Sequence, residues 1–189
     1  MVKEEIDSLL KAGFIYPVCN SEWVSSIVVV PKKVGADGKV KIRVCQDFRK
    51  LNAVTKKDYF PLPFTDIILD HVSGHENYSF LDGFSGYNRV FIRKGDQLKM
   101  TFITEWGTFA FNRMPFGLCN APGTFQRLMM DIFKDFLRHF LEVFIDDFAV
   151  FNGRTDHHEF LRKTFQRCCE TGLKLHPGKC FLGMESGVF

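Results

Sequence analysis

The sequence predicts an α+β fold in which helices pack on one face of an antiparallel sheet. Short apolar runs rich in β-branched and aromatic residues, each bounded by turn-forming residues, indicate strands. A stripe of apolar residues at helical spacing from Phe125 to Phe140 indicates a long helix. With 189 residues, 46% of them hydrophobic, the chain can bury a core as one medium domain or two small lobes.

The N-terminal part is expected to form a helix and a basic hairpin. An amphipathic helix is predicted over residues 4–12, with Gly13 as its stop. Strands over residues 24–30 and 39–44 follow, joined by a turn at residues 35–38. One side of this hairpin would carry Lys39, Lys41 and Arg43. Nine basic and three acidic residues lie between positions 32 and 58, which suits either phosphate-rich partners or a plain solvated face.

The next part of the chain is expected to lead through a linker into a second lobe. Residues 47–52 are predicted to form a turn-bound basic segment, and residues 61–63 a rigid extended linker. A helix is predicted over residues 64–72, with Thr65 or Asp66 near its start and Gly74 beyond its end. Its inward-facing residues would be Ile67, Ile68 and Leu69.

A small sheet and two longer helices are expected in the remainder. Strands are predicted over residues 89–92, 100–103 and 108–113, before a breaker-rich loop over residues 114–122. The long helix then runs from Phe125 to Phe140. A last helix is predicted over residues 156–170, with Thr155 as its cap and Gly172 as its stop.

Three acidic residues stand out because they end or join short apolar strands. Asp146 and Asp147 are predicted to lie at the tip of a β-hairpin over residues 141–151. An isolated pair of this kind is more often a solvated turn. Asp82, however, closes another apolar strand, and three acids at the ends of paired strands can form an oxygen-rich pocket suited to two Mg²⁺ ions.

Composition argues against several other classes of protein. No apolar run approaches the roughly 18 residues that a membrane span needs, and the charged N-terminus is unlike a signal peptide, so we expect a soluble, intracellular protein with no membrane partner. The six cysteines show no paired zinc spacing and are expected to be reduced. His71 and His75 are four residues apart, but Gly74 lies between them and argues against a metal site on one helix.

Five motifs follow one another along the chain. They are residues 46–52 (QDFRKLN), 80–88 (FLDGFSGYN), 113–122 (RMPFGLCNAP), 143–147 (VFIDD) and 172–175 (GLKL) with Lys179 and Cys180. In this order they resemble the reverse transcriptase domain of gypsy-type (Metaviridae) long-terminal-repeat retrotransposon polyproteins, nearest to the Athila-like plant elements. The resemblance covers nearly the whole chain.

The resemblance implies a right-hand polymerase fold and an RNA-directed DNA polymerase activity. The chain would supply the fingers (residues 1–56 and 90–120) and the palm (residues 57–89 and 121–189), without the thumb. The implied reaction is a nucleotidyl transfer that adds dNTPs to a primer 3′-hydroxyl by two-metal phosphoryl transfer. Asp82, Asp146 and Asp147 would hold two Mg²⁺ ions, or Mn²⁺ in their place, and the carbonyl of Gly83 would complete the shell of one ion.

The same resemblance implies a set of residues around the incoming nucleotide. Lys32, with Lys33 as the alternative, and Arg43 would hold the triphosphate, together with the backbone amides of Ser85 and Gly86. Arg43 suits this role because its planar fork makes bidentate phosphate contacts.

Other implied positions carry an alternative interpretation. Tyr87 matches an aromatic gate that excludes a ribose 2′-hydroxyl, although it would also suit a core. Phe116 would contact the nucleotide where retroviral enzymes carry glutamine, and Phe144 stands where many relatives have tyrosine. Lys179, or else Lys174, would protonate the pyrophosphate, and either would also suit an exposed surface.

The implied partners are an RNA or DNA template with its primer, dNTPs, and the thumb and ribonuclease H domains of a longer polyprotein. The implied location is a cytoplasmic virus-like particle or the nucleus. A catalytically silent or domesticated nucleic-acid-binding remnant is the main alternative. An RNA-making palm polymerase is disfavoured by Tyr87, and a two-metal hydrolase by Lys32 and Arg43.

Overall fold

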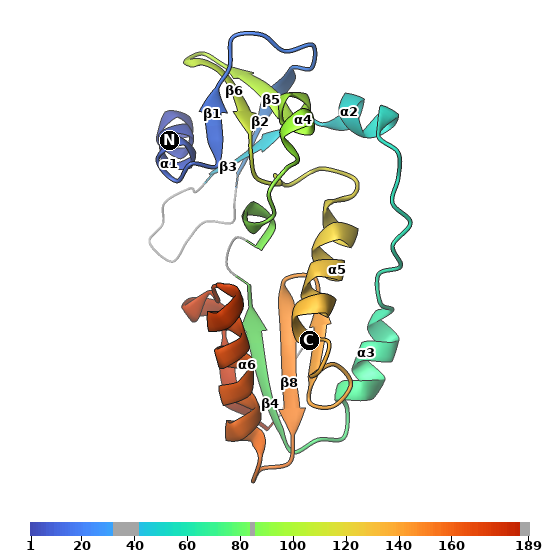
Figure 1. Ribbon diagram of the computed structural model, residues 1–189. Coiled ribbons are helices and arrows are strands. Elements are labelled where there is room, and N and C mark those ends of the chain that lie inside the picture. The colour runs from blue at the N-terminus through green and yellow to red at the C-terminus, as the bar shows by residue number, and fades with distance from the viewer. Residues whose placement is uncertain (32–41, 84–85, 186–189) are drawn as a thin grey trace. The chain divides into compact units, whose positions relative to one another are not determined.

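The computed structural model describes residues 1–31, 42–83 and 86–185, and the chain forms two compact units (Figure 1). Unit 1 consists of Met1–Lys57 and Tyr87–Ala121, and unit 2 of Asp58–Gly86 and Pro122–Phe189. Each unit has a sheet and helices of its own, as expected for an α+β protein. The predicted turn at residues 35–38 lies outside the described residues, as do Lys39 and Lys41.

Unit 1 is built on a five-stranded sheet with the order β1-β6-β5-β2-β3. All neighbouring strands are antiparallel except β2 and β5, which are parallel. The strands are β1 (Ile15–Pro17), β2 (Ser25–Pro31), β3 (Ile42–Gln46), β5 (Thr101–Thr104) and β6 (Gly107–Phe111). The predicted helix is α1 (Val2–Lys11), and its buried Ile6 packs with Phe102 and Phe111 of this sheet.

Short helical segments replace two elements that the sequence predicted differently. The predicted turn at residues 47–52 is wrong, because α2 (Arg49–Val54) begins there and the Asp47 carboxylate accepts the hydrogen bond of the Arg49 backbone N–H. The predicted strand at residues 89–92 is also wrong. That stretch follows the 3₁₀ helix η1 (Gly86–Arg89) and makes only an isolated bridge between Phe91 and Arg113. The short helices α4 (Lys94–Gln97) and η2 (Leu98–Met100) precede β5.

Unit 2 is built on a four-stranded antiparallel sheet with the order β7-β8-β4-β9. Its strands are β4 (Asn77–Asp82), β7 (Leu141–Phe144), β8 (Asp147–Asn152) and β9 (Phe181–Met184). Its helices are α3 (Thr65–Val72), α5 (Ala121–Phe133), α6 (His157–Thr171) and the short η3 (Pro177–Lys179). The hairpin predicted over residues 141–151 is therefore confirmed as β7 and β8.

Helices cover both faces of the unit 2 sheet, not one face as the sequence suggested. Phe133 of α5 contacts Phe148 of β8 edge-on, with ring centroids 5.4 Å apart. On the opposite face, Val72 of α3 packs against Ala149 and Phe151 of β8. The reason is that β8 is apolar at successive positions, so both of its faces have to be buried.

The C-terminal end of α5 and the inner face of α3 also differ from the prediction. In α3, Ile68 is buried, whereas Ile67 and Leu69 are about half exposed. In α5, the helix ends at Phe133 and not at Phe140. Arg138 adopts a left-handed conformation (φ 65°), which reverses the chain toward β7.

The remaining helix agrees with its prediction except at its N-cap. α6 is capped at its C-terminus by Gly172 in the left-handed conformation (φ 67°), as glycine allows. Its N-cap residue is Asp156 and not Thr155. Among the described residues, no helix is long and apolar enough to cross a membrane.

Candidate active site

Strand pairing in unit 2 brings the three predicted acids to one end of the sheet. β4 and β8 run antiparallel, and their register sets Asp82 directly opposite Asp147. Asp147 is also paired with Phe144 across the β7–β8 hairpin, so Ile145 and Asp146 form its two-residue turn. The pairing therefore joins a carboxylate from the middle of the sequence to two that lie 64 and 65 residues later.

The turn that carries Asp146 is held by backbone and side-chain hydrogen bonds. The Gly83 N–H donates to the Asp146 carbonyl oxygen at 2.8 Å. On the other side of the turn, the Ile145 N–H donates to Oε1 of Gln126 at 2.6 Å. Sequence reasoning missed Gln126. The sequence pattern that could have identified it is a polar residue at helical spacing on the buried face of α5, three residues before Met129 and seven before Phe133.

Two glycines make room for this arrangement. A Cβ atom on Gly86 would lie 2.5 Å from Oδ1 of Asp146 and 2.4 Å from Cζ of Phe125. Because real Cβ atoms do not approach other atoms so closely, only glycine fits at position 86 beside the acid. At Gly83 the added Cβ would lie 3.3 Å from the carbonyl oxygen of Asp146, a tighter contact than usual but not a clash. The backbone of Gly86 thus lies against the Asp146 carboxylate, whereas Ser85 lies outside the described residues.

The site concentrates negative charge on three side chains, of which those of Asp82 and Asp146 are partly buried and that of Asp147 is exposed. Burial, followed by the charges of Asp147 and Asp82, raises the pKa of Asp146 to about 6. The pKa of Asp147 is raised in the same way by burial and by Asp82. Oδ1 of Asp146 is buried and makes no hydrogen bond within the described part of the chain. Such carboxylates would gain free energy from a cation that replaced the lost water.

Lys179 supplies a positive charge at the edge of this cluster. Its Nζ donates a 2.8 Å hydrogen bond to Oδ2 of Asp82. That bond, with the charges of Asp82, Asp147 and Asp146, raises the pKa of the ammonium. The backbone holds the same region together, because the His176 N–H donates to the carbonyl oxygen of Asp82. Lys174, the alternative to Lys179, is exposed.

The donor set fits a hard divalent cation. The three carboxylates, including the Asp146 group whose Oδ1 makes no hydrogen bond within the described residues, supply the oxygen ligands that Mg²⁺ and Mn²⁺ prefer. In the described ranges, however, no three acidic, histidine or cysteine side chains converge closely enough to hold an ion as they stand. The ion pair between Lys179 and Asp82 is one contact that an ion would have to displace.

Three of the residues predicted to bind the nucleotide lie in unit 1. Arg43 is exposed on β3, where it pairs with Val30 of β2. Tyr87 is 7% exposed and meets Phe116 edge-on, with ring centroids 4.6 Å apart, while Phe116 itself is 57% exposed. The structure therefore brings Tyr87 and Phe116 together. Lys32 and Lys33 lie outside the described residues, and a nucleotide contact at Arg43, Tyr87 or Phe116 stays a prediction.

The loop that carries Phe116 is tied to α2. The side-chain amide of Asn52 donates to the Gly117 carbonyl oxygen at 2.8 Å, and its Oδ1 accepts from the Cys119 N–H at 2.9 Å. Gly117 has a φ of 94°, which favours glycine. Asn52 belongs to the first of the five motifs and Gly117 to the third. These two hydrogen bonds therefore connect two motifs that are far apart in the sequence.

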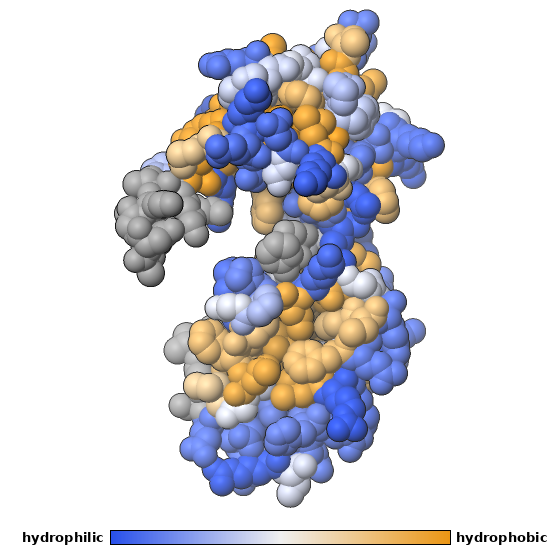
Figure 2. All heavy atoms as spheres, turned by 90° about the vertical axis from the view of Figure 1, so that its left-hand side faces the viewer, coloured by the Kyte–Doolittle hydropathy of each residue, from blue (hydrophilic) through white to orange (hydrophobic). Residues whose placement is uncertain are grey.

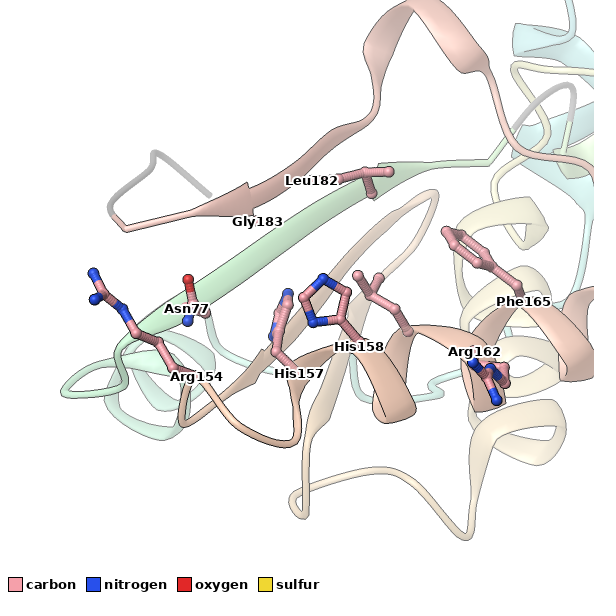
Figure 3. A pocket seen from close by; sticks show the side chains of 9 residues that line it. Asn77, Arg154, His157, His158, Arg162, Phe165, Leu182 and Gly183 are labelled. Atoms are coloured by element: carbon pink, nitrogen blue, oxygen red, sulfur yellow. The ribbon is translucent and has the colours of Figure 1, made fainter.

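A separate pocket of about 630 Å³ lies in unit 2 between α6, β9 and the start of β4 (Figure 3). Most of its lining residues are arginines, histidines and apolar residues. The full lining is Asn77, Arg154, His157, His158, Leu161, Arg162, Phe165, Leu182 and Gly183. None of the predicted site residues is among them. Figure 2 shows apolar side chains gathered over unit 2 on the side where α6 lies. Exposed apolar residues of β9 are Phe181, Leu182 and Met184.

Comparisons with known proteins agree on one family. A family model described as "Reverse transcriptase (RNA-dependent DNA polymerase)" matches residues 30–188. The chain is 35% identical over 187 residues to the retrovirus-related Pol polyprotein from transposon 297 of Drosophila melanogaster, covering 98% of this chain and 18% of that protein. It is 34% identical over 168 residues to the Pol polyprotein from transposon gypsy of the same organism, covering 88% of this chain and 16% of that protein.

A solved structure shows the same fold. The foamy viral protease-reverse transcriptase in complex with dsDNA superposes with a TM-score of 0.88 at 25% identity, covering 100% of this chain and 38% of that one. The fold class expected from the sequence is therefore confirmed. The chain spans less than a fifth of the length of the two Pol polyproteins.

Proposed function

The chain belongs to the reverse transcriptase family, and we propose that it extends a nucleic-acid primer with dNTPs on an RNA or DNA template. The observation that carries this proposal is the pairing of Asp82 with Asp147 beside the turn at Asp146, whose Oδ1 is buried without a hydrogen bond in the described part of the chain. The pKa values of Asp146 and Asp147 are raised, and neighbouring acids perturbed in this way are typical of a functional site such as one for divalent cations.

In this proposal, Asp82, Asp146 and Asp147 hold two Mg²⁺ ions, or Mn²⁺ in their place, and the Gly83 carbonyl contributes a ligand. Ions bound there would activate the primer 3′-hydroxyl and neutralise charge on the triphosphate and the departing pyrophosphate. The protein's own part is to bring the three carboxylates to one end of the sheet despite their repulsion. Strand pairing does this for Asp82 and Asp147, and the hydrogen-bonded turn does it for Asp146.

Unit 1 would serve as the fingers and unit 2 as the palm. Arg43, together with Lys32, would bind the triphosphate, because a guanidinium makes bidentate contacts with phosphate oxygens. The backbone amides of Ser85 and Gly86 would add further donors. Tyr87 would exclude a ribose 2′-hydroxyl, and its edge-on contact with Phe116 supports a fixed ring orientation.

Lys179 would act as the proton donor to the departing pyrophosphate. Its ammonium lies within hydrogen-bond distance of one acid of the cluster and stays protonated at neutral pH, because the surrounding acids raise its pKa. A donor of this kind protonates the leaving group as negative charge develops on it. Lys174 is exposed and has no described contact with the acids.

The wider setting is proposed from the relatives. The transposon 297 and gypsy proteins are Pol polyproteins, and we propose that this chain is likewise one domain of a gypsy-type polyprotein that also supplies a thumb and a ribonuclease H domain. The finer resemblance to Athila-like plant elements stays a prediction. So does a location in a cytoplasmic virus-like particle or the nucleus.

Primer extension tests the proposal. A DNA primer on an RNA template is incubated with Mg²⁺ and dNTPs, using the 189-residue chain and a longer version that includes a thumb. We expect incorporation that Asp146→Asn abolishes, whereas Asp131→Asn, which changes an exposed acid on α5, leaves it intact. If the longer protein binds primer-template but adds no nucleotide, the chain is a silent nucleic-acid-binding module instead.

A further inference from the structure

Gln126 is a fully buried polar residue, 1% exposed, in the middle of an apolar helix face. Both ends of its side-chain amide are used. The Nε2 group donates to the Val143 carbonyl oxygen at 3.0 Å, and Oε1 accepts from the Ile145 N–H at 2.6 Å. Both partners belong to the hairpin that carries the acids, 17 and 19 residues further along the chain. The side chain of Gln126 therefore joins α5 to the turn before Asp146.

The turn has a conformation that its sequence does not favour. Ile145 has a φ of 54°, in the left-handed region that β-branched residues rarely adopt. Glycine or asparagine is the usual choice at such a position in a two-residue hairpin loop. The contact with Gln126 satisfies the Ile145 N–H in a partly buried setting, where an unpaired donor would be costly. Gln126 thus supplies part of what the local sequence lacks.

The Asp146 carboxylate depends on this backbone for its position. Its Oδ1 makes no hydrogen bond within residues 1–31, 42–83 and 86–185. The backbone on either side is fixed by two bonds, from Gly83 N–H to the Asp146 carbonyl and from Ile145 N–H to Gln126. The carboxylate also lies close to Gly86, where an added Cβ atom would come within 2.5 Å of Oδ1, so little space is left on that side.

We infer that Gln126 is a positioning residue that holds the Asp146 carboxylate in the place where it binds a divalent cation. The inference rests on the proposed function, since it assigns Asp146 to a metal site. Both hydrogen bonds of Gln126 go to the backbone of the hairpin and neither goes to one of the three acids, so it would act through the backbone of the turn. It is comparable to the outer partners of metal ligands, whose loss typically lowers metal affinity or activity about 10- to 100-fold.

The test compares Gln126→Met with Met129→Ala. Methionine is close to glutamine in size but cannot make either hydrogen bond. Met129 is 1% exposed on the same helix, so its truncation lowers stability without removing a hydrogen bond to the turn. Mn²⁺ binding to each variant is measured by electron paramagnetic resonance, and protection of the Ile145 amide by hydrogen exchange. Thermal unfolding of both variants reports their loss of stability.

We expect Gln126→Met to weaken Mn²⁺ binding about 10- to 100-fold and to remove protection of the Ile145 amide. We expect Met129→Ala to preserve both, even where it unfolds at an equal or lower temperature. In primer extension, kcat should fall for Gln126→Met while KM for dNTP stays unchanged, because both hydrogen bonds of Gln126 go to the hairpin backbone and neither to a residue proposed to bind the triphosphate. An equal loss of Mn²⁺ affinity in the two variants would mean that Gln126 is only a core residue.

A second comparison separates this inference from the proposed function. If Asp146→Asn abolishes Mn²⁺ binding and extension but Gln126→Met changes neither, the positioning role is overturned and the proposed function stands. If Asp146→Asn binds Mn²⁺ as well as the unmodified chain, the metal site itself is wrong and the proposed function fails with it.

Discussion

Nζ of Lys179 donates a hydrogen bond of 2.8 Å to Oδ2 of Asp82. The lysine comes from the short helix η3, and the aspartate ends β4, 97 residues earlier in the chain. The Lys179 side chain is 61% exposed and that of Asp82 19%, so the pair lies at the rim of the acid cluster. The lysine thereby neutralises part of the charge that the strand pairing concentrates, and it competes with any ion for Asp82.

Replacing Lys179 should separate these two effects. In Lys179→Met we expect Mn²⁺ to bind about two- to fivefold more tightly, the factor available from an exposed ion pair of up to about 1 kcal/mol. We expect kcat for primer extension to fall about 100-fold, because the proton donor is lost. Titration by electron paramagnetic resonance and single-turnover extension measure the two quantities. Lys179→Arg is the control that keeps the positive charge. If kcat is unchanged in Lys179→Met, Lys179 is an exposed surface lysine and not the proton donor.

The raised pKa of Asp146 predicts how stability depends on pH. Burial and the charges of Asp147 and Asp82 raise that pKa to about 6, whereas an aspartate in an unfolded chain titrates near 4. The folded protein therefore binds the proton more tightly than the unfolded chain. It follows that the free energy of unfolding decreases as pH rises from about 4 through 6 in the absence of divalent cations.

Asp146→Asn should remove the contribution of Asp146 to this pH dependence. We expect the variant to unfold at a higher temperature than the unmodified chain at pH 7 in EDTA, and at a similar temperature at pH 4, although it is inactive. Thermal unfolding followed by circular dichroism measures the difference. The same proton opposes metal binding, so Mn²⁺ affinity of the unmodified chain should fall up to about tenfold per pH unit below 6. A variant that is less stable at pH 7 would contradict the assignment.

Gly86 should tolerate no side chain. In Gly86→Ala the new Cβ would meet both Phe125 and the Asp146 carboxylate at about 2.5 Å. We expect extension activity to fall about 100-fold or more, because a displacement of even 1 Å at a reacting group has that effect. Gly83→Ala should be milder, since its nearest contact would be 3.3 Å. Gly95→Ala, which meets nothing within 4 Å, is the matched control, and equal activity in all three variants would refute the close approach.

The contact between Tyr87 and Phe116 predicts a role for Phe116 in sugar selection. Edge-on aromatic pairs contribute about 0.5–1.5 kcal/mol, so Phe116→Ala should release the Tyr87 ring and relax the preference for dNTP over rNTP up to about tenfold. Tyr87→Val should relax it further. The measurement is the ratio of kcat/KM for dNTP and rNTP. Trp106→Ala changes an exposed aromatic residue of unit 1 and should leave the ratio unchanged. An unchanged ratio in Phe116→Ala would mean that the Tyr87 ring does not depend on Phe116.

Local pattern predicted the elements whose signals lie within one stretch of chain. α6 and its glycine stop were predicted correctly, as were α1 and the β7–β8 hairpin, although only Asp146 lies in the turn and Asp147 begins β8. The errors occurred where contacts distant in sequence override the local pattern. The stripe of α5 continues beyond Phe133, yet Phe136 and Phe140 pack their rings together in a turn, with centroids 4.9 Å apart.

The sequence by itself determined the family, the order of the elements and the three acids, because these are written in residue types and in spacings of a few positions. Only the tertiary structure decided that Asp82 lies opposite Asp147, that Lys179 bonds to Asp82 and that Gly86 lies against Asp146. The two hydrogen bonds from Gln126 to the β7–β8 hairpin were likewise decided only by the tertiary structure. Each depends on packing between segments tens of residues apart, where the burial of apolar surface sets the geometry and no local periodicity records it.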